Sequence, residues 1–175
     1  MYVSIKEQIE KELCKLIGKK IKGFGRAALM LIANYGEIPN PSEAECKEKD
    51  ISSKLYAIHA HSSWRLLKDD DIILAQSEMF NRVIDGCFKI YEYEDEEAQN
   101  NVPFIKISDE LNAIFESEII RVTKIEANEL GDLKVFMEKG YCLEIFVDSI
   151  GNIESWRFFA DGDTKHFVVF EDEEE

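Results

Sequence analysis

Two histidines, His59 and His61, are separated by one residue in a segment of strand-like composition. Residues two apart in a β-strand point to the same face of the sheet, so the two imidazoles are predicted to stand side by side. Imidazole nitrogens are common ligands of zinc. With His166 as a third ligand, the pattern predicts a metal-dependent or hydrolytic enzyme. No carboxylate lies in residues 54–64 to support these histidines, so two histidines on the polar face of a half-exposed strand are the simpler interpretation.

A tryptophan followed by an arginine occurs twice, as Trp64-Arg65 and Trp156-Arg157, and the chain has two tryptophans in all. Tryptophan and arginine are favoured at binding hot spots, so an exposed pair would be a binding surface. We favour the alternative that each tryptophan anchors the core of its own half of the chain. The arginine, one residue on, then points to the opposite face, where it can pair with a carboxylate such as Glu144 or Asp71, or stack on a ring.

Carboxylates gather at 69–71, 94–97 and 161–163. Acid–base catalysis needs two carboxylates in contrasting, partly buried environments, whereas these lie in turns and charge runs. We therefore assign no catalytic residue, and the absence of phosphate-binding and nucleotide-binding glycine motifs predicts no cofactor. The run that contains Glu94, Asp95 and Glu96 is instead a candidate surface for a basic partner.

The net charge of −15 is unevenly distributed. Residues 1–80 hold 12 Lys/Arg and 12 Asp/Glu, while residues 81–175 hold 9 Lys/Arg and 24 Asp/Glu. Such an acidic half repels nucleic acid and attracts basic proteins. The simpler alternative is that the acidity only keeps the protein in solution.

Hydrophobic periodicity predicts a helix in each half, followed by strands. Ser4 and Glu7 form a capping box for a helix over 4–17, and Ser108 is the predicted cap of a second helix. The predicted strands lie at 19–24, 27–35, 54–61, 63–68, 71–77, 119–127, 131–138, 141–148, 154–159 and 165–170. Cys87–Tyr93 has the alternation of a further strand.

Several segments recur in the same order in the two halves. Lys20–Phe24 resembles Arg121–Ile125, and Leu29–Gly36 resembles Leu133–Gly140. Asp71–Ala75 likewise resembles His166–Phe170. We therefore predict an internal duplication.

The predicted fold class is α+β, with two similar halves related by a pseudo-twofold axis. Each half is expected to be a helix plus about four mostly antiparallel strands. The first half covers 1–80 with an insertion at 37–53, and the second covers 108–170. An acidic connector at 81–107 joins them, and a disordered acidic tail follows at 171–175.

The segment Ile58–Arg65 and the following Asp71–Ser77 resemble an uncharacterised bacterial family in which a Leu-His strand leads to Cys-Pro-Trp-Arg. The companion segments are Gly140–Phe146 and Glu154–Arg157. Here Ser62-Ser63 stands where that family has Cys-Pro, which argues against a required thiol. The second half is also similar to small bacterial immunity-type proteins. The bacterial family has no established activity that the resemblance could carry over to this chain.

The expected function is thus a non-catalytic, immunity-like protein that binds a basic partner such as a toxic nuclease. The alternatives are the metal-dependent enzyme and a structural homodimer. The N-terminal residues lack an apolar core followed by a cleavage site, and no apolar run reaches the roughly 20 residues of a membrane span. We therefore expect a cytoplasmic protein without membrane contact, and the four widely spaced cysteines are expected to be free thiols.

Overall fold

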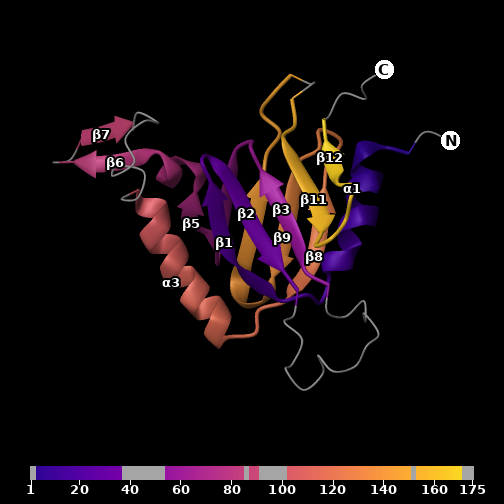
Figure 1. Cartoon of the computed structure of the whole chain (residues 1–175), viewed down its shortest axis with the longest axis horizontal. Helices are drawn as coiled ribbons and strands as arrows, with labels where there is room; N and C mark the ends of the chain where they lie inside the picture. The colour runs from indigo at the N-terminus through magenta and orange to yellow at the C-terminus, as the bar shows by residue number, and fades with distance from the viewer. Residues whose placement is uncertain (1–2, 37–53, 85–86, 91–101, 151–152, 171–175) are drawn as a thin grey trace.

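The computed structural model describes residues 3–36, 54–84, 87–90, 102–150 and 153–170. The predicted insertion, the acidic run with Glu94, Asp95 and Glu96, and the tail lie outside these residues. Within the described residues the protein is α+β, as expected, with two antiparallel sheets of five strands (Figure 1). Two α-helices accompany them, α1 (Ile5–Leu13) and α3 (Pro103–Ser117).

The strands of the five-stranded sheets are β1 (Ile21–Ala27), β2 (Met30–Tyr35), β3 (Tyr56–Ala60), β4 (Trp64–Lys68), β5 (Asp71–Ala75), β8 (Val122–Ala127), β9 (Leu133–Met137), β10 (Tyr141–Ile145), β11 (Trp156–Ala160) and β12 (Phe167–Val169). The described residues also form three short 3-10 helices, η1 (Cys14–Leu16), η3 (Gln76–Met79) and η4 (Glu138–Gly140). A separate two-stranded sheet, β6 (Asn81–Ile84) with β7 (Cys87–Ile90), lies between the halves in sequence. The sequence pattern predicted β7 and missed β6.

Each five-stranded sheet takes strands from both halves of the chain. The first sheet has the order β1-β2-β3-β11-β12, and the second has the order β5-β4-β10-β9-β8. Three consecutive strands of one half are thus completed by two strands of the other. Each half contributes five strands, where about four were predicted.

The two sheets face each other across one hydrophobic core (Figure 1). Alternation within the strands decides which side chains enter it: Leu31, Ala33 and Tyr35 of β2 are buried, and the residues between them are more exposed. Antiparallel strands with one buried face show this period of two. Ile9 and Leu13 of α1 reach the same core.

The helices lie against edge strands of both sheets. Helix α3 contacts β1 and β5, while α1 contacts β8. Asn112 of α3 fastens one edge, because its Oδ1 accepts from the backbone N of Phe24 at 2.8 Å and its Nδ2 donates to the Phe24 carbonyl at 2.9 Å. This occupies backbone groups that an edge strand would otherwise offer to another chain.

The two helix starts differ in how well the sequence predicted them. Ser4 and Glu7 form the predicted capping box of α1, with reciprocal hydrogen bonds of 3.3 and 3.2 Å. Helix α3 begins at Pro103, so the prediction of a cap at Ser108 is wrong. Ser108 lies buried within the helix and donates to the Ile105 carbonyl at 3.0 Å. Proline is well suited to the first turn, where its missing N–H costs no hydrogen bond.

Gly36, at the end of β2, is required by its surroundings as well as by its backbone. Its φ is +125°, and an added Cβ would lie 2.8 Å from the carbonyl oxygen of Lys54. Gly18 has a φ of +82° but nothing within 4 Å of an added Cβ. We expect Gly36→Ala to lower the free energy of unfolding by about 3 kcal/mol and Gly18→Ala by about 1 kcal/mol. Urea unfolding of both variants measures this, and equal losses would contradict the steric argument.

Candidate functional site

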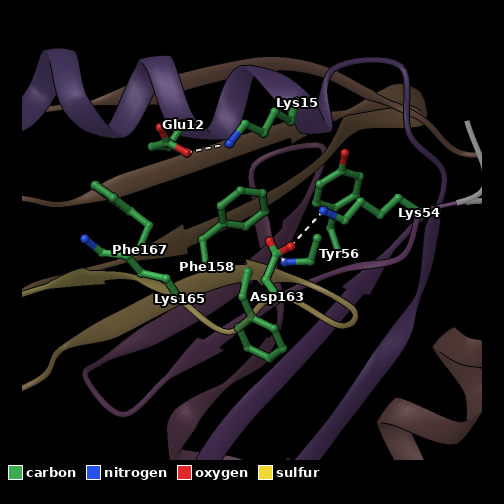
Figure 2. Close-up of a pocket in the computed structure, with 10 residues that line it drawn as sticks. Glu12, Lys15, Lys54, Tyr56, Phe158, Asp163, Lys165 and Phe167 are labelled. Atoms are coloured by element: carbon green, nitrogen blue, oxygen red, sulfur yellow. Dashed lines mark hydrogen bonds and ion pairs between the residues drawn. The ribbon is translucent and has the colours of Figure 1, made fainter. Parts of the chain in front are cut away.

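A cavity of about 380 Å³ lies at the corner where α1 meets β3, β11 and β12 (Figure 2). Aromatic rings form much of its wall. Tyr56 and Phe158 are stacked at 5.7 Å between ring centroids with an interplanar angle of 7°. Phe158 pairs with Phe167 across neighbouring strands. Inward-facing positions of three strands therefore place these rings together.

Charged side chains form the rest of the wall. Lys54 Nζ lies 2.8 Å from Asp163 Oδ1, and Lys15 Nζ lies 2.5 Å from Glu12 Oε2. The hydrogen bond from Lys54, together with one from the Ala160 amide, lowers the pKa of Asp163. Both pairs place a cation beside an anion in the cavity wall.

Two groups in this cavity have no polar partner among the described residues. Lys165 forms no ion pair there, and its side chain extends away from the Lys54–Asp163 pair (Figure 2). The Tyr56 side chain is 6% exposed, and its hydroxyl has no hydrogen-bond partner among the described residues. It points toward α1 (Figure 2). Lys165 is exposed to solvent, so the Tyr56 hydroxyl is the more enclosed of the two groups.

The three histidines of the predicted metal site lie in one region of the first sheet but do not form a site. The Phe159 ring meets His59 edge-on at 4.8 Å and stacks on His166 at 4.1 Å. His61 Nε2 instead faces Glu154 Oε1 at 3.7 Å. In the described part of the chain, no three His, Cys, Asp or Glu side chains are placed to hold a metal ion. The three histidines therefore do not converge within the described residues, and a metal site that uses them stays the less favoured hypothesis.

His59 is paired with Arg157 across β3 and β11. Burial first, and then the positive charge of Arg157, lowers the pKa of His59. Arg157 donates through Nε to Glu154 Oε1 at 2.5 Å and through a second nitrogen to Oε2. This part of the outer face is thus a stacked and hydrogen-bonded cluster of His59, Phe159, His166, Arg157 and Glu154.

Both tryptophans are buried, with exposed fractions of 3% for Trp64 and 0% for Trp156. This agrees with the core-anchor interpretation, and it removes both side chains from any binding surface. The arginines point to the outer faces as expected. Arg65 Nε donates to Glu144 Oε2 at 2.5 Å and its guanidinium lies 5.1 Å from the Phe146 ring centroid.

The cavity was not found from the sequence. Lys54 and Asp163 lie 109 residues apart, and they meet only because β3 pairs with β11. Asp163 was noted as a turn residue, which it is, since its carboxylate accepts from the Ala160 amide at 3.1 Å. The alternation around Tyr56 and Phe158 was the one available signal, and it predicts burial without indicating a cavity.

Comparison of the chain with protein-family models, with curated proteins and with solved structures found no match. The resemblances to the bacterial family and to immunity-type proteins therefore stay predictions. No helix in the described part of the chain has both the length and the apolar composition needed to cross a membrane.

Proposed function

We propose that the protein is a non-catalytic binding protein that engages a basic protein partner. The distribution of charge carries this proposal. The whole chain has 21 Lys/Arg and 36 Asp/Glu, whereas the described residues have 19 and 20, a net charge of −1. Nearly all of the net charge of −15 therefore belongs to three short segments, 37–53, 91–101 and 171–175.

Charge concentrated in short segments produces a stronger local potential than the same charge spread over a surface. Such a potential speeds association with a basic surface and makes the association rate sensitive to salt. The described residues have a net charge of −1, and the excess of acidic residues lies in the three short segments. This arrangement favours steering toward a basic partner over a role in solubility alone. The partner would be a basic toxin such as a nuclease if the immunity-like resemblance holds.

Affinity capture from the cells that make the protein tests this function. One variant replaces Glu92, Glu94, Asp95, Glu96 and Glu97 by glutamine. The control variant changes five exposed carboxylates among the described residues to amides, namely Asp109, Glu110, Glu116, Glu129 and Asp161. The two variants have the same net charge.

We expect a basic protein to be captured by the natural chain at low salt and released at high salt. Its recovery should fall about tenfold with the first variant and little with the control, because nearby charges dominate screened attraction. Recovery of no basic protein at low salt, or equal loss with both variants, would contradict the proposal.

We also propose that the chain is a duplicated unit whose halves exchange strands about a pseudo-twofold axis. The strand orders support this. The exchange replaces each of the strands β1 to β5 by its counterpart among β8 to β12, in chain order, and each of β8 to β12 by its counterpart among β1 to β5. This exchange converts the strand order of the first sheet into that of the second. The helices fit the same exchange, because α1 contacts β8 while α3 contacts β1.

The registers support the exchange residue by residue. Both β1–β2 and β8–β9 have an irregularity, between Ile21 and Gly23 and between Val122 and Lys124. These are the positions that the sequence comparison aligned. The bridge between Lys20 and Arg121 joins two residues that the comparison also aligned.

The tryptophans occupy matching places in this scheme. Trp156 pairs with Ala60, which pairs with Leu31, and Trp64 pairs with Ile145, which pairs with Leu133. Leu31 is thus the counterpart of Leu133, whereas the sequence comparison aligned Leu29 with Leu133. The alignment of Leu29–Gly36 with Leu133–Gly140 is therefore displaced by two residues. A crystal structure tests the proposal: one rotation should carry every strand and both tryptophans onto their counterparts, and a rotation that matches one sheet only would exclude it.

A further inference from the structure

We propose that the cavity between α1 and the first sheet is a binding site for a small aromatic carboxylic acid. At about 380 Å³ it lies at the lower end of the range of small-molecule pockets. Such pockets combine apolar and aromatic walls with a few polar groups that orient the ligand. Tyr56, Phe158 and Phe167 supply the aromatic wall.

The charges in the wall select for an anion. Glu12 is neutralised by Lys15 and Asp163 by Lys54, so the two carboxylates have cationic partners within the wall. Lys165 remains as a positive charge without a partner among the described residues. The charged residues that line the cavity, three lysines and two carboxylates among the described residues, thus have a net charge of +1, which attracts an anion.

The Tyr56 hydroxyl is the group expected to orient the ligand. Tyr56 is 94% buried, since 6% of it is exposed, and buried tyrosines ordinarily hydrogen-bond through the hydroxyl. Here the hydroxyl has no described partner, and it lies in the cavity wall beside Lys54. It is free to donate to a carboxylate oxygen, while the ligand ring packs against Phe158.

The second sheet has a tyrosine in the corresponding place. Tyr141 begins β10 in the second sheet, as Tyr56 begins β3 in the first. The Tyr141 ring is covered by Phe115 of α3, with centroids 5.5 Å apart, and by Lys68, whose Nζ lies 4.5 Å from the ring centroid. Tyr141 therefore serves as a matched control for Tyr56.

Titration of the whole protein with indole-3-acetate, followed by amide NMR shifts, tests the site. Indole-3-acetamide is the uncharged control ligand. The test variants are Tyr56→Phe and Lys165→Gln, and their controls are Tyr141→Phe and Lys106→Gln. Each substitution keeps most of the side-chain volume, so folding is preserved and verified by the remaining amide spectrum.

We expect saturable shifts in residues 54–56 and 158–167 with a dissociation constant below about 1 mM. Tyr56→Phe and Lys165→Gln should each weaken binding about fivefold, while the two controls leave it unchanged. The amide should bind about tenfold more weakly than the acid. No saturable binding, equal binding of acid and amide, or equal effects of test and control variants would overturn the proposal. None of these results depends on the acidic segments 37–53, 91–101 and 171–175. The ligand site and the proposed protein partner are therefore tested separately.

Discussion

Replacing Trp156 by alanine is expected to lower the free energy of unfolding by about 4 kcal/mol, which lies within the usual range for a buried tryptophan. The side chain is fully buried and its ring lies 6.2 Å from that of Phe167, centroid to centroid. Its Nε1 donates to the Gly131 carbonyl at 2.9 Å. Truncation removes the apolar contacts of the ring and leaves the carbonyl without this donor. Urea unfolding followed by circular dichroism measures the loss.

The phenylalanine variants separate packing from hydrogen bonding. Trp64 is also buried, but its Nε1 has no hydrogen-bond partner in the part of the chain that the structure describes. Trp64→Phe therefore removes ring volume and relieves an unsatisfied donor, whereas Trp156→Phe removes ring volume and breaks a bond. We expect Trp156→Phe to cost about 1–3 kcal/mol more than Trp64→Phe. Equal costs would show that the bond to Gly131 contributes little.

Replacing Glu144 by glutamine is expected to lower the free energy of unfolding at neutral pH by about 2 kcal/mol. The Glu144 side chain is 4% exposed and binds Arg65 at 2.5 Å and Lys134 at 2.7 Å. Breaking a buried ion pair ordinarily costs about 3–5 kcal/mol, and this value is reduced because both cations are partly exposed and can be rehydrated.

The effect of Glu144 depends on pH in a defined direction. Burial alone would raise the pKa of Glu144, but hydrogen bonds from Lys134 and Arg65 outweigh it and hold the pKa below its usual range. A carboxyl with a lower pKa in the folded state contributes fully above its unfolded pKa of about 4.3. That contribution is lost as the pH falls through the folded pKa.

Unfolding of the natural chain and of Glu144→Gln between pH 7 and pH 3 tests this linkage. The difference in free energy of unfolding should be constant down to about pH 5 and shrink below it. Glu129→Gln is the control, because Glu129 is exposed and has no ion pair with another described residue. A difference that is constant across the range would mean that Glu144 does not titrate differently in the folded state.

Local patterns predicted most of the secondary structure because they depend on residues close in sequence. The capping box at Ser4 and the alternation of β2 are examples, since their hydrogen bonds or side-chain directions follow from the local backbone. Ser108 shows the limit of this reasoning. A serine followed by two acidic residues has the composition of a cap, but Pro103 and the buried Phe104 extend the helix further upstream.

The sequence was less informative about the candidate site. It placed His59, His61 and His166 on strands, whereas in the structure the Phe159 ring contacts His59 and His166, and His61 faces Glu154. The residues that line the cavity have no local signature, because lysines, tyrosines and phenylalanines occur along the whole chain. They are distinguished only by their positions in the folded protein, where they meet between α1 and the strands β3, β11 and β12.

The sequence by itself determined the fold class, the two helices and the burial expected of both tryptophans. Each follows from local periodicity or from the large apolar area that one side chain removes from water. Only the tertiary structure decided that strands are exchanged between the halves, so that β3 pairs with β11 and β10 with β4. Such pairing is selected by the summed packing of residues far apart in sequence, and no local pattern contains that information. The Lys54–Asp163 pair and the cavity beside Tyr56 are products of that exchange.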